Sequence, residues 1–141
     1  MVRIRRTGAI ASALIGFACS SNGPTNGVDL VVFRALVYGT VATSGAPVPG
    51  AEVVLRSFNL QCGTGPFATD TVTTTGLGQY RQVVRKVNDN LSACIEVRVR
   101  PPQGSGLNEA EGEATGIAFL PDTLPLRDST RVDIELSPLG S

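Results

Sequence analysis

The chain is predicted to be an all-β protein, a seven- to eight-stranded antiparallel β-sandwich. Its 141 residues include 16 Gly and 9 Pro, and Val and Thr are abundant, a composition typical of short strands joined by turns. Apolar and polar residues alternate in several short runs, which is the period of a half-buried strand. The apolar content of 42% is sufficient for one core, so we expect one folded domain.

The first two strands are expected at residues 30–42 and 52–58, on either side of a turn. Pro47 and Pro49 lie in that turn. Each fixes φ near −65° and lacks an amide donor, so neither fits a central strand. Gly50 supplies the backbone freedom that lets the chain reverse before alternation resumes.

The same region carries a family motif. Gly39-Thr40-Val41 is followed by Pro47-Val48-Pro49-Gly50-Ala51-Glu52-Val53-Val54-Leu55, and Thr73-Thr74-Thr75-Gly76-Leu77-Gly78-Gln79-Tyr80 comes next. This pattern, over residues 37–84, resembles the carboxypeptidase regulatory-like domain, a transthyretin-like sandwich. Thr75 stands where an acidic residue is often found in that family. Such domains accompany peptidases, receptors and surface proteins without being catalytic, so the resemblance implies an accessory module.

Further strands follow the same alternation. They are expected at residues 67–75, 79–87, 93–100, 113–120 and 130–136. The run from Ala93 to Arg100 alternates most regularly, and Tyr80 is expected to face inward. The threonines between residues 69 and 75 suggest either a glycan- or ice-binding array or an ordinary solvated strand face, and strand propensity favours the second.

Residues 1–18 have the features of a secretory signal, since three arginines precede an apolar run too short to span a membrane. Cys19 ends that run, and this arrangement resembles a bacterial lipoprotein signal in which the cysteine is lipidated. Gly16 stands where the lipobox usually has leucine, and Gly16-Phe17-Ala18 also fits an ordinary cleavage site. Residues 19–28 then form the lipidated cysteine and a flexible tether, and residues 29–138 form the domain.

Export makes a disulfide chemically possible. Cys62 and Cys94 are the cysteines that remain once Cys19 is assigned to the anchor. We predict that they pair, and the alternative is two buried free thiols.

The chain contains no histidine. The usual general base near neutral pH, the Ser-His and Cys-His nucleophile systems and the commonest zinc ligand are therefore missing. The purine-degradation hydrolase of transthyretin-like fold and the metallocarboxypeptidases both depend on histidines, so neither activity fits. We expect no catalytic residues, no cofactor and no metal. Glu109, Glu111 and Glu113 near Asn108, and Asp89, suggest a hard-cation site, but solvated acidic loops are commoner.

Charge narrows the choice of partners. Without the leader arginines, nine basic residues face twelve acidic ones, which argues against nucleic acid as a partner.

The sequence therefore predicts an exported, non-catalytic lipoprotein of the cell envelope, anchored in the outer membrane, that acts as a structural, accessory or protein-binding module. A glycan- or peptide-binding module is the alternative. Sugar sites rest on exposed aromatic rings, whereas Tyr38, Tyr80 and the phenylalanines are expected in the core.

Overall fold

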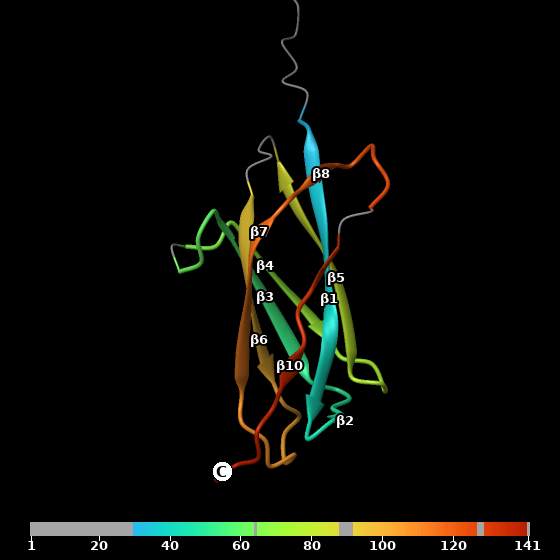
Figure 1. Ribbon diagram of the computed structural model, residues 1–141, viewed down its shortest axis with the longest axis vertical. Coiled ribbons are helices and arrows are strands. Elements are labelled where there is room, and N and C mark those ends of the chain that lie inside the picture. The colour runs from blue at the N-terminus through green and yellow to red at the C-terminus, as the bar shows by residue number, and fades with distance from the viewer. Residues whose placement is uncertain (1–29, 64, 88–91, 127–128, 141) are drawn as a thin grey trace, which may run out of the picture.

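The computed structural model describes residues 30–63, 65–87, 92–126 and 129–140, which contain strands and turns but no helix (Figure 1). The ten strands in these ranges are β1 (Val32–Thr43), β2 (Ala46–Pro47), β3 (Glu52–Asn59), β4 (Ala68–Thr73), β5 (Gln79–Val87), β6 (Ala93–Arg100), β7 (Ala110–Ile117), β8 (Leu120–Pro121), β9 (Ser129–Arg131) and β10 (Ile134–Glu135). No described segment is a helix long and apolar enough to cross a membrane.

Strand β1 organises the first sheet because it has partners along both edges. β5 pairs with it antiparallel, from Val32 opposite Val87 to Thr40 opposite Gln79. The other edge is shared in turn by β8, β9 and β10, the last two running parallel to β1. β2 folds back on the end of β1. In Figure 1, β1 runs along the long axis of the molecule with β5 beside it.

The second sheet has the order β4-β3-β6-β7, and all its neighbours are antiparallel. β3 and β6 form its centre, from Glu52 opposite Arg100 to Asn59 opposite Ala93. The inner faces of the two sheets supply alternating apolar residues, and the space between them is the core. Its fully buried side chains include Val37, Val41, Val53, Leu55, Val84, Ile95, Val97 and Val99.

The predicted all-β class and sandwich architecture are confirmed. β5 and β6 occupy the predicted ranges 79–87 and 93–100 without a shift, and Tyr80 faces inward with 3% of its surface exposed. The strand number is higher than predicted because β2, β8 and β10 are only two residues long. The first sheet also includes the two short parallel pairings of β1 with β9 and β10.

Strand β7 runs from Ala110 to Ile117, so it begins three residues before the predicted strand over residues 113–120. The reason lies in what packs against it. A Cβ on Gly112 would lie 2.6 Å from Ile134 Cδ1 and 3.2 Å from Val132 Cγ1. The absence of a side chain at position 112 therefore lets Val132 and Ile134 pack against β7. This strand therefore lacks the large apolar residues by which strands are recognised in a sequence.

The closing segment, predicted as one strand over residues 130–136, is divided into β9 and β10 around Val132 and Asp133. Val132 N donates to Tyr38 O at 2.9 Å, as in a regular ladder. Its carbonyl instead accepts from the Tyr80 hydroxyl at 2.5 Å. The Thr40 amide, the next donor along this edge of β1, bonds to the Asp133 carboxylate at 2.9 Å. The Val132 carbonyl and the Thr40 amide are therefore both hydrogen-bonded, but to side chains instead of to each other.

Gly39 makes this replacement of a main-chain hydrogen bond by side-chain hydrogen bonds possible. A Cβ at this position would lie 1.9 Å from Val132 O and 2.9 Å from Tyr80 Cε1. Any larger residue would push the closing segment and the tyrosine ring away from β1. The glycine of the Gly39-Thr40-Val41 motif therefore has a packing role, and its φ lies outside the left-handed region.

Candidate functional site

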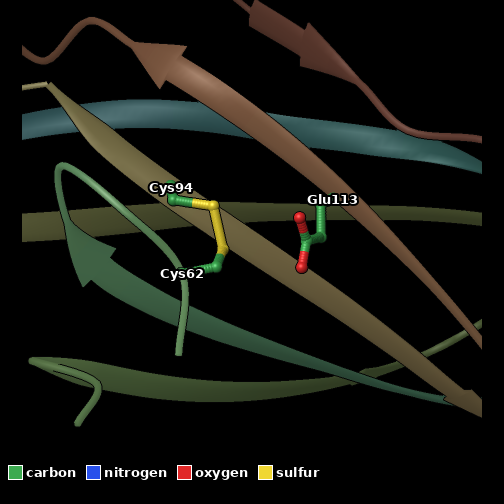
Figure 2. Close-up of side chains that lie close together, drawn as sticks. All are labelled: Cys62, Cys94 and Glu113. Carbon is green, nitrogen blue, oxygen red and sulfur yellow. A yellow bond between two sulfur atoms is a disulfide. The ribbon is translucent and has the colours of Figure 1, made fainter. Parts of the chain in front are cut away.

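Cys62 and Cys94 are joined by a disulfide, as the sequence predicted, with their Cα atoms 5.2 Å apart. Figure 2 shows the bond beside β6, tying the loop that follows β3 to that strand. Phe58 lies directly opposite Cys94 in the β3–β6 register. Its side chain is fully buried yet lies outside the main core, and the Arg56 guanidinium sits 5.2 Å from its ring centroid. The disulfide thus closes a small second apolar cluster.

Glu113 on β7 points toward this disulfide (Figure 2). One ligand atom from each of Cys62, Cys94 and Glu113 lies within 4.8 Å of the others. Sulfurs bonded to each other are not thiolates, and thiolates are the form that binds metal. While the disulfide is intact, the cluster offers a metal one carboxylate.

The neighbouring glutamates are engaged by arginines. Arg98 pairs with Glu111, and Arg100 lies 2.9 Å from Glu52 and 3.8 Å from Glu109. Two of the three glutamates weighed above as cation ligands therefore belong to a charge ladder on the outer face of the second sheet. Asn108 is bonded to the C-terminal segment instead, donating to Pro138 O at 3.0 Å.

The threonine-rich strand β4 exposes Thr69, Thr71 and Thr73, while Ala68, Asp70 and Val72 between them are partly buried. This is the solvated strand face that the sequence favoured. Thr74, just after the strand, is the exception. It is 5% exposed, accepts from Ala51 N at 2.9 Å and donates to Val48 O at 2.8 Å.

An open groove of about 680 Å³ lies across the outer face of the first sheet and reaches the corner between β4 and β5. Its lining residues are Leu36, Tyr38, Gly39, Thr40, Val72, Thr73, Thr75, Gln79, Tyr80, Arg81, Ser129 and Arg131.

Tyr38 lies at the centre of this groove. Its pairing partners are Arg81 on β5 and Arg131 on β9, so the three residues form a row across the sheet. Of the aromatic side chains that the structure describes, Tyr38 is the most exposed, at 36%. The expectation that the tyrosines lie in the core is therefore correct for Tyr80 and wrong for Tyr38. The signal was present, because strict alternation from inward Val37 directs Tyr38 outward.

One side of the groove is fixed by the bonds of Asp133. Its carboxylate accepts from the Thr40 amide and hydroxyl, both at 2.9 Å, and lies 2.8 Å from Arg131 Nε. Partial burial alone would raise the pKa of Asp133, but these hydrogen bonds outweigh it and hold that pKa below its ordinary value. The hydrogen bond to Asp133 in turn raises the pKa of Arg131. Arg131 therefore stays charged at the groove edge.

The groove offers recognition chemistry, with one aromatic ring, two guanidinium groups, and hydroxyl and amide side chains. None of its lining side chains is a carboxylate, a thiol or an imidazole, the groups that usually move protons or attack carbonyls. The arrangement of these residues suits binding.

Two predicted sites fall outside the described residues. They are the proposed lipidation site Cys19 and the turn that contains Asp89.

No protein-family model matches the chain, and no curated protein matches it.

Proposed function

We propose that this chain is a non-catalytic β-sandwich lipoprotein of the cell envelope. In this proposal, lipidated Cys19 holds the domain at the outer membrane, and the domain acts as a structural, accessory or protein-binding module. The observation that carries the proposal is the Cys62–Cys94 disulfide, because such bonds form in oxidising compartments outside the cytosol. The apolar leader ending in Cys19 and the absence of histidine from the sequence support it.

The resemblance to carboxypeptidase regulatory-like domains is part of this proposal. Two residues of the motif have structural roles that fit this resemblance. Gly39 permits the close approach of Val132, and Tyr80 donates to the carbonyl of that residue. In this proposal the fold is transthyretin-like, and its role is that of a companion domain.

Replacing the proposed lipidation site tests the anchor. A Cys19→Ser chain, expressed with its leader in a host that processes lipoproteins, is expected to move from the membrane fraction to the soluble envelope fraction. It should also lose incorporation of labelled palmitate, since the acyl chains supply the membrane affinity. A Ser21→Ala chain is the matched control and should remain lipidated. Full membrane retention of the Cys19→Ser chain would contradict the proposal.

A second candidate function is glycan or peptide binding. The observation that favours it is the groove around Tyr38, which combines an exposed aromatic ring with polar side chains. Ring faces cover the apolar faces of sugars and peptides, and nearby polar groups fix their orientation. This candidate is compatible with the first, because an anchored accessory module can act by holding a ligand.

A further inference from the structure

The two outer faces of the sandwich differ in how their arginines are satisfied. On the second sheet, Arg56, Arg98 and Arg100 each pair with a glutamate. On the first sheet, the side chains of Arg81 and Arg85 form no ion pair or hydrogen bond with the residues that the structure describes. An exposed guanidinium without a carboxylate partner keeps its donors for a ligand, and its planar fork suits a carboxylate.

Of these two arginines, Arg81 lines the groove and Arg85 does not. It lies opposite Tyr38 in the strand register, and Arg131 lies on the other side of the ring. Arg131 shares its charge with Asp133, whereas Arg81 does not. The groove therefore has a positive charge beside an aromatic ring, although the sequence without its three leader arginines has more acidic than basic residues. This local charge favours an anionic ligand.

Three further lining side chains have unused hydrogen-bonding groups. Within the described residues, the side chains of Thr73, Gln79 and Ser129 make no hydrogen bond. Hydroxyl and amide groups both donate and accept. They match the hydroxyl groups of a sugar, which have the same dual character.

The floor of the groove distinguishes a glycan from an extended peptide. Strand β1 is paired along both edges, by β5 on one side and by β8, β9 and β10 on the other. Its main-chain groups are therefore already bonded, and the floor presents side chains only. An extended peptide gains affinity by adding its main chain to an open strand edge. The floor of the groove offers no such edge, and the edges of β4 and β5 that lack a strand partner lie only at its corner. A sugar needs only the ring and the polar side chains.

We propose that this groove binds a glycan whose sugars carry carboxylate groups. Tyr38 lies under the apolar face of a sugar ring, Arg81 holds the carboxylate, and the Arg131–Asp133 ion pair borders the groove on the other side of the ring. The proposal rests on the glycan-binding candidate function and adds the chemical class of the ligand.

Titration calorimetry with two ligands that differ in one group tests the proposal. The full chain, purified in detergent, is titrated with oligogalacturonate and with a neutral galactose oligomer of equal length. Binding of the acidic oligomer is expected to be at least about tenfold tighter, because the charged hydrogen bonds to Arg81 require the carboxylate. Raising the salt concentration should weaken only the acidic oligomer's binding.

Substitutions on one strand face provide the matched controls. Arg81→Gln is expected to weaken oligogalacturonate binding about tenfold. Arg85→Gln removes the same charge from the same face of β5, outside the groove, and should leave affinity within about twofold. Tyr38→Ala should weaken the binding of both oligomers. Thermal unfolding of each variant checks the fold. The exposed side chain of Arg81 bonds to no described residue, so Arg81→Gln is expected to leave the fold intact.

Each contrary outcome would overturn a different part of the glycan-binding proposal. Equal losses in Arg81→Gln and Arg85→Gln would show diffuse charge attraction and overturn the site. Equal binding of both oligomers, lost in Tyr38→Ala, would overturn the carboxylate specificity and leave the glycan-binding function standing. Equal binding of an oligoglutamate peptide in the groove would overturn the glycan class. Binding of neither oligomer would overturn the inference, while the envelope anchor stands or falls separately with Cys19→Ser.

Discussion

At the residue scale, Tyr80 connects segments that are far apart in the sequence. Its ring packs beside Gly39, and its hydroxyl donates to Val132 O at 2.5 Å. Desolvation by burial, with a smaller contribution from the charge of Asp133, raises the pKa of this phenol above its ordinary value. The hydroxyl therefore remains protonated, and remains a donor, throughout the physiological range.

Removing this hydroxyl should be costly. Tyr80→Phe is expected to lower the free energy of unfolding by about 1–3 kcal/mol, because it leaves the Val132 carbonyl without that donor in a buried setting. Urea denaturation measures the difference. Tyr38→Phe is the matched control, since that side chain is 36% exposed, and it should change stability by about 0.5 kcal/mol or less. Similar losses in both variants would contradict the role assigned to Tyr80.

At the element scale, the closing segment is held to β1 by side chains where the ladder is interrupted. Asp133 takes the place of a main-chain acceptor for Thr40 and also pairs with Arg131. Its lowered pKa means that folding favours the ionised carboxylate. The stability contributed by this group is therefore present above its unfolded pKa of about 3.9 and is lost as the pH falls through the lower folded value.

The Asp133→Asn variant tests this dependence. The native chain should be more stable than the variant from about pH 5 to pH 7, and the difference should narrow as the pH falls below about 4. Denaturant unfolding at a series of pH values gives both curves. A difference that stays constant down to pH 2 would show that the ionised carboxylate has no special role.

The alternation of residues predicted most elements but not this interruption. Ile95, Val97 and Val99 are all fully buried, so the period-2 pattern located β6 without error. The exchange of partners around Val132 depends on contacts with Gly39 and Tyr80, which are distant in sequence. A pattern of apolar residues contains no information about which carbonyl a distant hydroxyl will reach.

The groove was predictable only in part, for a similar reason. Alternation along β1 directs Tyr38 outward, but the presence of Arg81 and Arg131 beside it depends on the pairing of β1 with β5 and β9. That register is a property of the folded sheet. The pairing of Cys62 with Cys94 needed less information, because only two cysteines remained to be joined.

At the scale of the whole molecule, the disulfide reinforces one sheet from its outer side. Cys62 and Cys94 are 32 positions apart in the sequence. Replacing both by Ala is expected to lower the free energy of unfolding by about 3–4 kcal/mol, because the open loop gives the unfolded chain more freedom. Denaturant unfolding measures this loss, and reducing the native protein should reproduce it. Two free thiols besides Cys19 in unfolded, unreduced protein would contradict the prediction.

The position of β1 between early and late segments has a consequence for biogenesis. One edge of this strand is completed by β5, but the other is completed by β8, β9 and β10, which follow all the other described strands in the chain. Until they arrive, the nascent polypeptide presents a bare strand edge that invites pairing with other chains. Such long-range closure is slow to form. The order of synthesis therefore leaves β1 paired along one edge only until the segment from Leu120 to Glu135 has been made.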